Sequence, residues 1–191
     1  MPKRSRVTAA SVSDEAPASS ATVPSASPGG PAPRYVRAMI TMKTKYALKA
    51  LAYLATAPPE APVLIAEISE KEGIPKKFLE LILAELKQHG FVRSRKGRGG
   101  GYYLAAEPQK IPIAGIIRVL DGPIAPVPCL SRTSYQPCDG CKDEATCGVR
   151  LVLQDLYEAS VRILESTSLA DLVKKVETAS KEGPPLLRYF I

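Results

Sequence analysis

Four cysteines carry the most distinctive chemistry of this chain, and they lie in one segment. Cys129, Cys138, Cys141 and Cys147 are separated by eight, two and five residues and account for every thiol in the sequence. Thiolates bind iron–sulfur clusters and zinc far better than oxygen ligands do. The pair Cys138-x-x-Cys141 is also a common zinc half-site. The spacing alone leaves three interpretations open: an iron–sulfur centre, a zinc knuckle, or reduced thiols in a mobile loop.

A second chemical feature is a basic, glycine-rich stretch upstream of the cysteines. The segment 76–98 carries seven basic side chains against two acidic ones, within a chain of net charge +7. Such a concentration predicts a polyanionic partner. Its sharpest part alternates cations with glycines, so that backbone and side chains can both approach a narrow groove: Arg95, Lys96, Gly97, Arg98, Gly99 and Gly100. The alternative is a flexible hairpin whose charges only keep the protein in solution.

Composition excludes several classes of protein. A chain of 191 residues with 45% hydrophobic and 24% charged residues suits one globular domain with tails. Its apolar runs are too short for a transmembrane helix, and the N-terminus lacks the apolar core of a secretory signal. We therefore expect a cytoplasmic protein whose cysteines are ligands or redox thiols. With one histidine and no plausible nucleophile–base pair, we do not expect an enzyme.

The elements that position these residues follow from periodicity. Apolar residues at helical spacing predict a helix over 41–57, capped by Thr41 and ended by Pro58–Pro59, a second over 64–71, and a third over 76–88. Strands at 91–95 and 101–105 flank the glycine-rich tip. The order helix, helix, turn, helix, hairpin predicts a winged helix-turn-helix. The fold class is thus mainly α with a small β-hairpin, followed by a long C-terminal helix.

Beyond the hairpin, the sequence predicts a short helix over 113–120, a loop over 123–146 with three of the cysteines, and a long helix. A loop of that length in a compact domain is functional or disordered. One apolar stripe runs along the long helix, and we expect it to face a second copy across a dimer axis. Its members are Val149, Val152, Leu153, Leu156, Tyr157, Ser160, Ile163 and Leu164.

These elements divide the chain into five segments. Residues 1–38, of which 23 are Ala, Ser, Pro or Gly, are expected to be a disordered extension, although a transit peptide or a translation start at Met39 or Met42 are alternatives. Residues 39–107 form the DNA-binding domain and 108–147 the connecting helix and cysteine loop. Residues 148–176 are predicted as the dimerisation helix and 177–191 as a tail.

The recognition helix of such a fold presents its N-terminal residues to the major groove. Lys76 and Lys77 suit phosphate or guanine, and Glu80 can accept a hydrogen bond from cytosine or simply favour the first helical turn. The full set of expected DNA contacts adds the hairpin tip and the start of the first helix: Lys43, Thr44, Lys45, Pro75, Lys76, Lys77, Phe78, Glu80, Arg95, Lys96, Gly97, Arg98, Gly99 and Gly100.

Several of these segments resemble the IscR/NsrR/CymR-type winged-helix repressors, the Rrf family. The matching stretches are 45–51 (first helix), 74–83 (recognition helix), 90–94 with 97–104 (wing) and 168–173 (closing helix). The resemblance spans roughly residues 39–176 in the expected order. It implies a homodimer that binds a palindromic operator on double-stranded DNA, with Glu80 where some members read a base.

The resemblance also bears on the cysteines. Sensor members of the family hold a 2Fe–2S or 4Fe–4S cluster with three cysteines of this loop, to which Cys129, Cys141 and Cys147 correspond best. Some members add an acidic ligand from the first helix, but the corresponding position in this chain is Lys45. Other members add a histidine after the last cysteine, but this chain has Gly148-Val149-Arg150 there. Both departures favour Cys138 as a fourth ligand, although a resolving thiol remains an alternative.

Together these features predict a transcriptional regulator, most simply a repressor, whose operator affinity is set by an iron–sulfur cluster. A regulator with a zinc site or a cluster-free thiol switch is the alternative. An iron–sulfur carrier is a further rival, but the basic wing would have no purpose in it.

Overall fold

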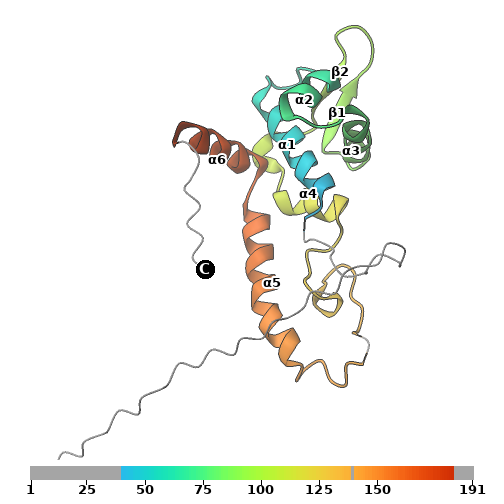
Figure 1. Ribbon diagram of the computed structural model, residues 1–191, viewed down its shortest axis with the longest axis vertical. Helices are drawn as coiled ribbons and strands as arrows, with labels where there is room; N and C mark the ends of the chain where they lie inside the picture. Colours follow the sequence, from blue (N-terminus) through green and yellow to red (C-terminus); the bar gives the residue numbers. More distant parts are fainter. Residues whose placement is uncertain (1–39, 139, 183–191) are drawn as a thin grey trace, which may run out of the picture. The chain divides into compact units, whose positions relative to one another are not determined.

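The computed structural model describes residues 40–138 and 140–182. The expected disorder of 1–38 therefore lies outside the described residues. The described elements run in the order α1, α2, α3, β1, β2, α4, α5 and α6, with short 3-10 turns at Pro108–Lys110 and Pro128–Leu130 (Figure 1). The architecture is mainly helical with one two-stranded antiparallel sheet, as the sequence predicts. None of the helices in these two ranges is long and apolar enough to cross a membrane.

Three helices build the core of the N-terminal part. They are α1 (Met42–Thr56), α2 (Ile65–Glu72) and α3 (Lys76–Gln88), within a residue of the expected bounds. The Thr41 hydroxyl accepts a hydrogen bond from the Thr44 N–H and caps α1. Gly73 ends α2 with a φ of 63°, a left-handed conformation that glycine adopts without strain. Their inward faces form the core through Leu51, Leu54, Ile68, Leu79, Ile82, Leu83 and Leu86.

The wing consists of β1 (Val92–Arg95) and β2 (Gly101–Leu104), paired from Val92 with Leu104 to Arg95 with Gly101. Each strand is one residue shorter than expected. Val63, just before α2, adds a bridge to Tyr102 through two backbone hydrogen bonds of 2.8 Å. A Cβ on Gly101 would lie 2.3 Å from the Val63 carbonyl oxygen, so this close approach requires glycine. The bridge joins the wing to the helix pair that it flanks.

Helix α4 (Ile113–Leu120) has the predicted bounds and packs its buried residues, among them Ile116 and Ile117, into the same core. It ends at Asp121, whose carboxylate binds the N-terminus of α1. The cysteine loop thus follows closely after a residue that is fixed to the first helix of the DNA-binding domain.

The C-terminal region differs from the expectation of one helix over 148–176. Helix α5 (Gly148–Ser166) is followed by a separate α6 (Leu169–Glu182), so helix continues well into the segment predicted as a tail. Ser168 and Asp171 exchange hydrogen bonds of 2.6–3.2 Å and cap α6. Ile113 donates a backbone hydrogen bond to Thr167, and Leu169 donates one to Ile111. These contacts hold 167–168 extended and break the helix.

The predicted stripe on α5 divides between two faces. Tyr157 is buried, and Leu153 and Leu164 pack against the core. Val149, Val152, Leu156 and Ile163 are 57–74% exposed. The expectation that the whole stripe meets a second copy is therefore wrong for the first set, because α5 also packs against α4 of its own chain.

Candidate DNA-binding surface and cysteine site

The outer face of α3 carries the predicted recognition residues. Pro75, Lys76, Lys77 and Glu80 are all exposed at the N-terminal end of the helix. Leu81 is also 66% exposed there, and we did not expect it from the sequence. The sequence signal that could have identified Leu81 is that the amphipathic pattern of the helix does not need this leucine for the core. An exposed apolar side chain at this position suits contact with a thymine methyl group.

Phe78 is placed differently from the expected DNA contact. It is half-buried, and its ring meets Tyr46 of α1 edge to face, with ring centroids 5.8 Å apart. This geometry joins α1 and α3 and leaves Phe78 as a packing residue. The expectation that it reaches DNA is not supported by its position.

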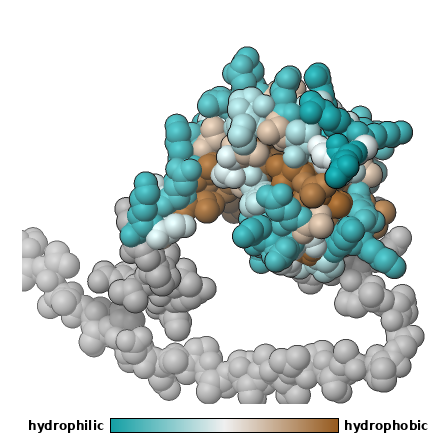
Figure 2. Space-filling view, turned by 90° about the horizontal axis from the view of Figure 1, so that it is seen from above, coloured by the Kyte–Doolittle hydropathy of each residue, from teal (hydrophilic) through white to brown (hydrophobic). Residues whose placement is uncertain are grey.

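The wing tip projects the expected cations. Arg95 at the end of β1 is exposed, and so are the turn residues Lys96, Gly97, Arg98 and Gly99. Gly100 is buried instead, because its Cα lies against the turn and a Cβ would approach the Arg95 carbonyl oxygen to 2.3 Å. Position 100 therefore requires glycine for the geometry of the turn and not for a close approach of the backbone to DNA. Figure 2 shows hydrophilic residues standing out around this end of the molecule, with a hydrophobic patch between them.

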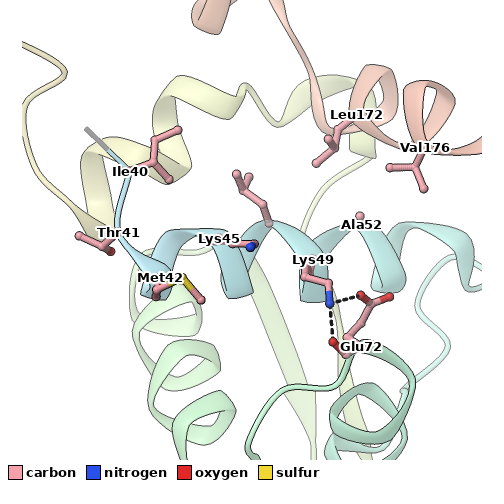
Figure 3. A pocket seen from close by; sticks show the side chains of 10 residues that line it. Ile40, Thr41, Met42, Lys45, Lys49, Ala52, Glu72, Leu172 and Val176 are labelled. Carbon is pink, nitrogen blue, oxygen red and sulfur yellow. Dashed lines mark hydrogen bonds and ion pairs between the residues drawn. The ribbon is translucent and has the colours of Figure 1, made fainter. Parts of the chain in front are cut away.

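The three expected contacts at the start of α1 are mostly engaged within the protein. Lys43 forms an ion pair with Glu85 of α3, at 2.6 Å. Thr44 is fully buried, so the expected DNA contact is wrong for this residue. Lys45 is exposed but lines an apolar cavity of about 430 Å³. Figure 3 shows this cavity, which Leu48 and Ala52 of α1 and Leu172 and Val176 of α6 also line.

The cysteine loop connects α4 to α5, and Cys147 directly precedes α5 (Figure 1). Cys129 is buried in the turn Pro128–Leu130, whereas Cys138, Cys141 and Cys147 are half-buried. The Cys138 thiol lies against Cys129, and this hydrogen bond, together with partial burial, raises the pKa of Cys138. Partial burial, followed by the nearby Cys147 and Glu144, raises the pKa of Cys141. Cys138 therefore lies beside Cys129, whereas Cys141 is within electrostatic reach of both Cys147 and Cys129.

The donor set fits a soft metal or an iron–sulfur centre in its chemistry, since all four groups are thiols. Within residues 40–138 and 140–182, however, no three Cys, His, Asp or Glu side chains converge on one point as metal ligands. Holding a shared centre requires the thiols to move closer together than they lie here.

Polar side chains cross-link this loop, and we did not expect them from the sequence. Arg150 of α5 donates a hydrogen bond to the Cys129 carbonyl and forms an ion pair with Glu144 at 3.3 Å. The Tyr135 hydroxyl donates to the same carboxylate, which raises the pKa of Tyr135. No motif signals such contacts, because their partners are set by the path of an irregular loop.

An exposed, basic recognition helix beside a basic β-hairpin defines a winged-helix DNA-binding protein. Comparison with known proteins agrees: residues 40–175 match the Rrf2 family, described as "Iron-dependent Transcriptional regulator". The chain belongs to the Rrf2 family of transcriptional regulators.

Individual relatives support this assignment. The chain is 46% identical to an rrf2-like HTH-type transcriptional regulator of Rhodobacter capsulatus over 75% of this chain and 97% of that protein. It is 34% identical to the HTH-type transcriptional regulator IscR of Xenorhabdus nematophila over 72% and 80%. These relatives are transcriptional regulators and not enzymes, as the sequence predicted.

Solved structures give the same fold. CymR of Bacillus subtilis, described as its global cysteine regulator, has a TM-score of 0.60 at 31% identity, over 71% of this chain and 96% of that one. IscR of T. potens has a TM-score of 0.58 at 30% identity, over 73% and 89%. The winged-helix class is thereby confirmed.

Proposed function

We propose that this regulator is a homodimer whose affinity for a palindromic operator depends on an iron–sulfur cluster held by Cys129, Cys138, Cys141 and Cys147. The observation that carries the proposal is the gathering of all four thiols in one loop directly before α5, where they lie near enough to affect one another's pKa. The IscR relatives and the iron-dependent family description support it.

The loop is attached to both functional parts of the chain. At its start, Asp121 binds Thr41 at the N-terminus of α1. At its end, Cys147 leads into α5, whose exposed apolar face suits a second copy. A bound cluster supplies a rigid, reversible cross-link between the thiols. Fixing the loop changes how Asp121 and α5 are held, so operator affinity shifts by the free-energy difference between the two states.

For DNA contact we propose a narrower set than the sequence suggested. Lys76, Lys77 and Glu80 face the major groove from α3, joined by Leu81. The exposed cations of the wing tip, Arg95, Lys96 and Arg98, track the phosphate backbone or enter the minor groove. Lys45 contributes only if DNA reaches its side of α1.

The homodimer is proposed from the exposed residues Val149, Val152, Leu156 and Ile163 of α5. Their spacing places them along one side of the helix, as in a coiled-coil seam. An apolar stripe of this kind is unfavourable in water and suits an isologous contact with the same stripe of a second copy.

The deciding experiment is anaerobic purification followed by a visible spectrum and assays of iron, sulfide and zinc. We expect iron and sulfide in the wild-type protein, with an operator affinity that differs between the loaded and cluster-free forms. Protein that carries zinc without sulfide after expression with ample iron would contradict the proposal.

The contact between Cys129 and Cys138 favours a second candidate, a cluster-free thiol switch. Two thiols in contact can form a disulfide on oxidation without moving far. Protein that contains neither metal nor sulfide, but whose operator binding changes reversibly with oxidation, would establish it.

A further inference from the structure

Arg150 lies in the first turn of α5 and contacts two separate parts of the cysteine loop. Its Nη1 atom donates a hydrogen bond to the backbone carbonyl of Cys129. The same atom lies 3.3 Å from a carboxylate oxygen of Glu144. The two side chains of this ion pair are only 27% and 33% exposed, so water screens the contact less than it would a pair on the open surface.

The two partners lie beside different cysteines. Cys129 is the first cysteine of the loop and lies beside Cys138, whereas Glu144 lies between Cys141 and Cys147 in the sequence. The Tyr135 hydroxyl also binds Glu144 from the stretch between Cys129 and Cys138. One guanidinium therefore connects the turn that holds Cys129 to the stretch that carries Cys141 and Cys147.

Such a connection matters because the loop has little other regular structure. Between the turn Pro128–Leu130 and the start of α5, the described residues contain no helix or strand. Cys129 is only 5% exposed, so its backbone carbonyl has little access to water and needs a hydrogen-bond donor from the protein. A guanidinium stays charged at all relevant pH values, and charge-assisted hydrogen bonds are the stronger kind.

We propose that Arg150 is a positioning residue of the sensor loop, which holds Cys129 and the stretch between Cys141 and Cys147 at the separation that a shared iron–sulfur cluster needs. This inference rests on the proposed function for its cluster, but the contacts on which it depends are those of the polypeptide alone. Arg150 acts through the cysteines and is not itself a ligand.

The test compares full-length, anaerobically purified variants. Arg150→Met keeps an unbranched side chain in place of the apolar stem of arginine and removes both contacts. Arg150→Lys restores them in part, because a single nitrogen makes both and an ammonium offers three donors. Arg162→Met, at an exposed position on the same helix, is the matched control. Each protein is measured for iron and sulfide, for loss of the visible cluster signal to a chelator, and for the alkylation rate of Cys129 in the reduced, metal-free form.

We expect the Arg150→Met cluster to be lost about tenfold faster than that of the wild type, which corresponds to one charge-assisted hydrogen bond. Alkylation of Cys129 should accelerate by a similar factor, with Arg150→Lys intermediate and Arg162→Met like the wild type. Unchanged cluster loss and unchanged alkylation in Arg150→Met would overturn the inference.

Failure of the proposed function gives a different result. If the wild type loads no cluster, the cluster role of Arg150 is overturned together with the proposed function. The alkylation rates still report, in that case, whether Arg150 holds Cys129 in place. Equal loss of cluster in Arg150→Met and Arg150→Lys, with normal alkylation in both, would also count against positioning.

Discussion

Asp121 holds Thr41 through two hydrogen bonds, although 80 residues separate them in the sequence. One Asp121 oxygen accepts from the Thr41 backbone N–H at 2.9 Å, and the other accepts from its hydroxyl at 2.5 Å. Burial alone would raise the pKa of Asp121, but the hydrogen bonds from Thr41 and the charge of Lys43 together lower it. The end of α4 is thus tied to the start of α1 by an ionised carboxylate.

This contact makes stability depend on pH. Because the pKa of Asp121 is lowered by folding, its contribution is present above the ordinary aspartate pKa of about 3.9 and is lost as pH falls through the folded value. Asp121→Asn should lower the free energy of unfolding at pH 7 by about 1 kcal/mol. Urea unfolding should show this difference shrinking below about pH 4. Asp155→Asn, at an exposed position on α5, is the control and should change little.

The wing should contribute electrostatic, sequence-independent affinity. Replacing Arg95, Lys96 and Arg98 by alanine should weaken binding to all duplexes by similar factors. The slope of log K against log salt should shrink by about 0.9 for each phosphate that the wing no longer neutralises. Replacing the exposed Lys174, Lys175 and Lys181 of α6 removes the same charge elsewhere and should leave the slope nearly unchanged. A wild-type slope in the wing variant would show that the wing does not touch DNA.

Glu80 is expected to affect sequence preference more than overall affinity. Glu80→Ala should relax discrimination at one base pair of the operator by roughly 1–3 kcal/mol, measured with a panel of single-substituted duplexes. Glu177→Ala, at an exposed position on α6, should leave that preference intact. An equal gain of affinity for every duplex would mean that the Glu80 carboxylate only repels phosphate.

Cys138 decides between a four-thiolate site and a resolving thiol. If it is a ligand, Cys138→Ala should contain less iron and sulfide per chain and lose its cluster to oxygen faster, as should Cys141→Ala, because water or a weaker ligand replaces the thiolate. If it is a resolving thiol, the variant should load normally and lack only a disulfide after oxidation. The partner that we expect in that disulfide is Cys129, against which Cys138 lies.

The exposed face of α5 should hold the dimer together. Leu156→Glu places a charge in the proposed apolar seam, and each leucine contributes roughly 1.5–3 kcal/mol on burial. We expect the dimer dissociation constant to rise at least tenfold in sedimentation equilibrium. Leu151→Glu is the matched control: Leu151 is also exposed, but it lies on a different side of the helix. Equal dissociation in both variants would argue against this face as the interface.

Local patterns in the sequence were sufficient for most of the elements. The bounds of α3 and α4 follow directly from apolar periodicity and from Pro75, Gly90 and Gly122, and the wing follows from a glycine-rich tip between two short strands. The break between α5 and α6 was not visible in the same way. It depends on Ile111 and Pro112 pairing with 167–169, an interaction across more than fifty residues that periodicity does not encode.

The candidate site shows the same division. Residue type and spacing determined that the thiols belong to one loop and that the exposed cations belong to α3 and the wing tip. Only the tertiary structure decided that Thr44 is buried, that Phe78 packs on Tyr46, and that Gly100 serves its turn. It also decided that Arg150 and Asp121 fix the two ends of the cysteine loop. Helix and strand signals arise between near neighbours in the chain, whereas burial and polar pairing depend on which distant segments pack together.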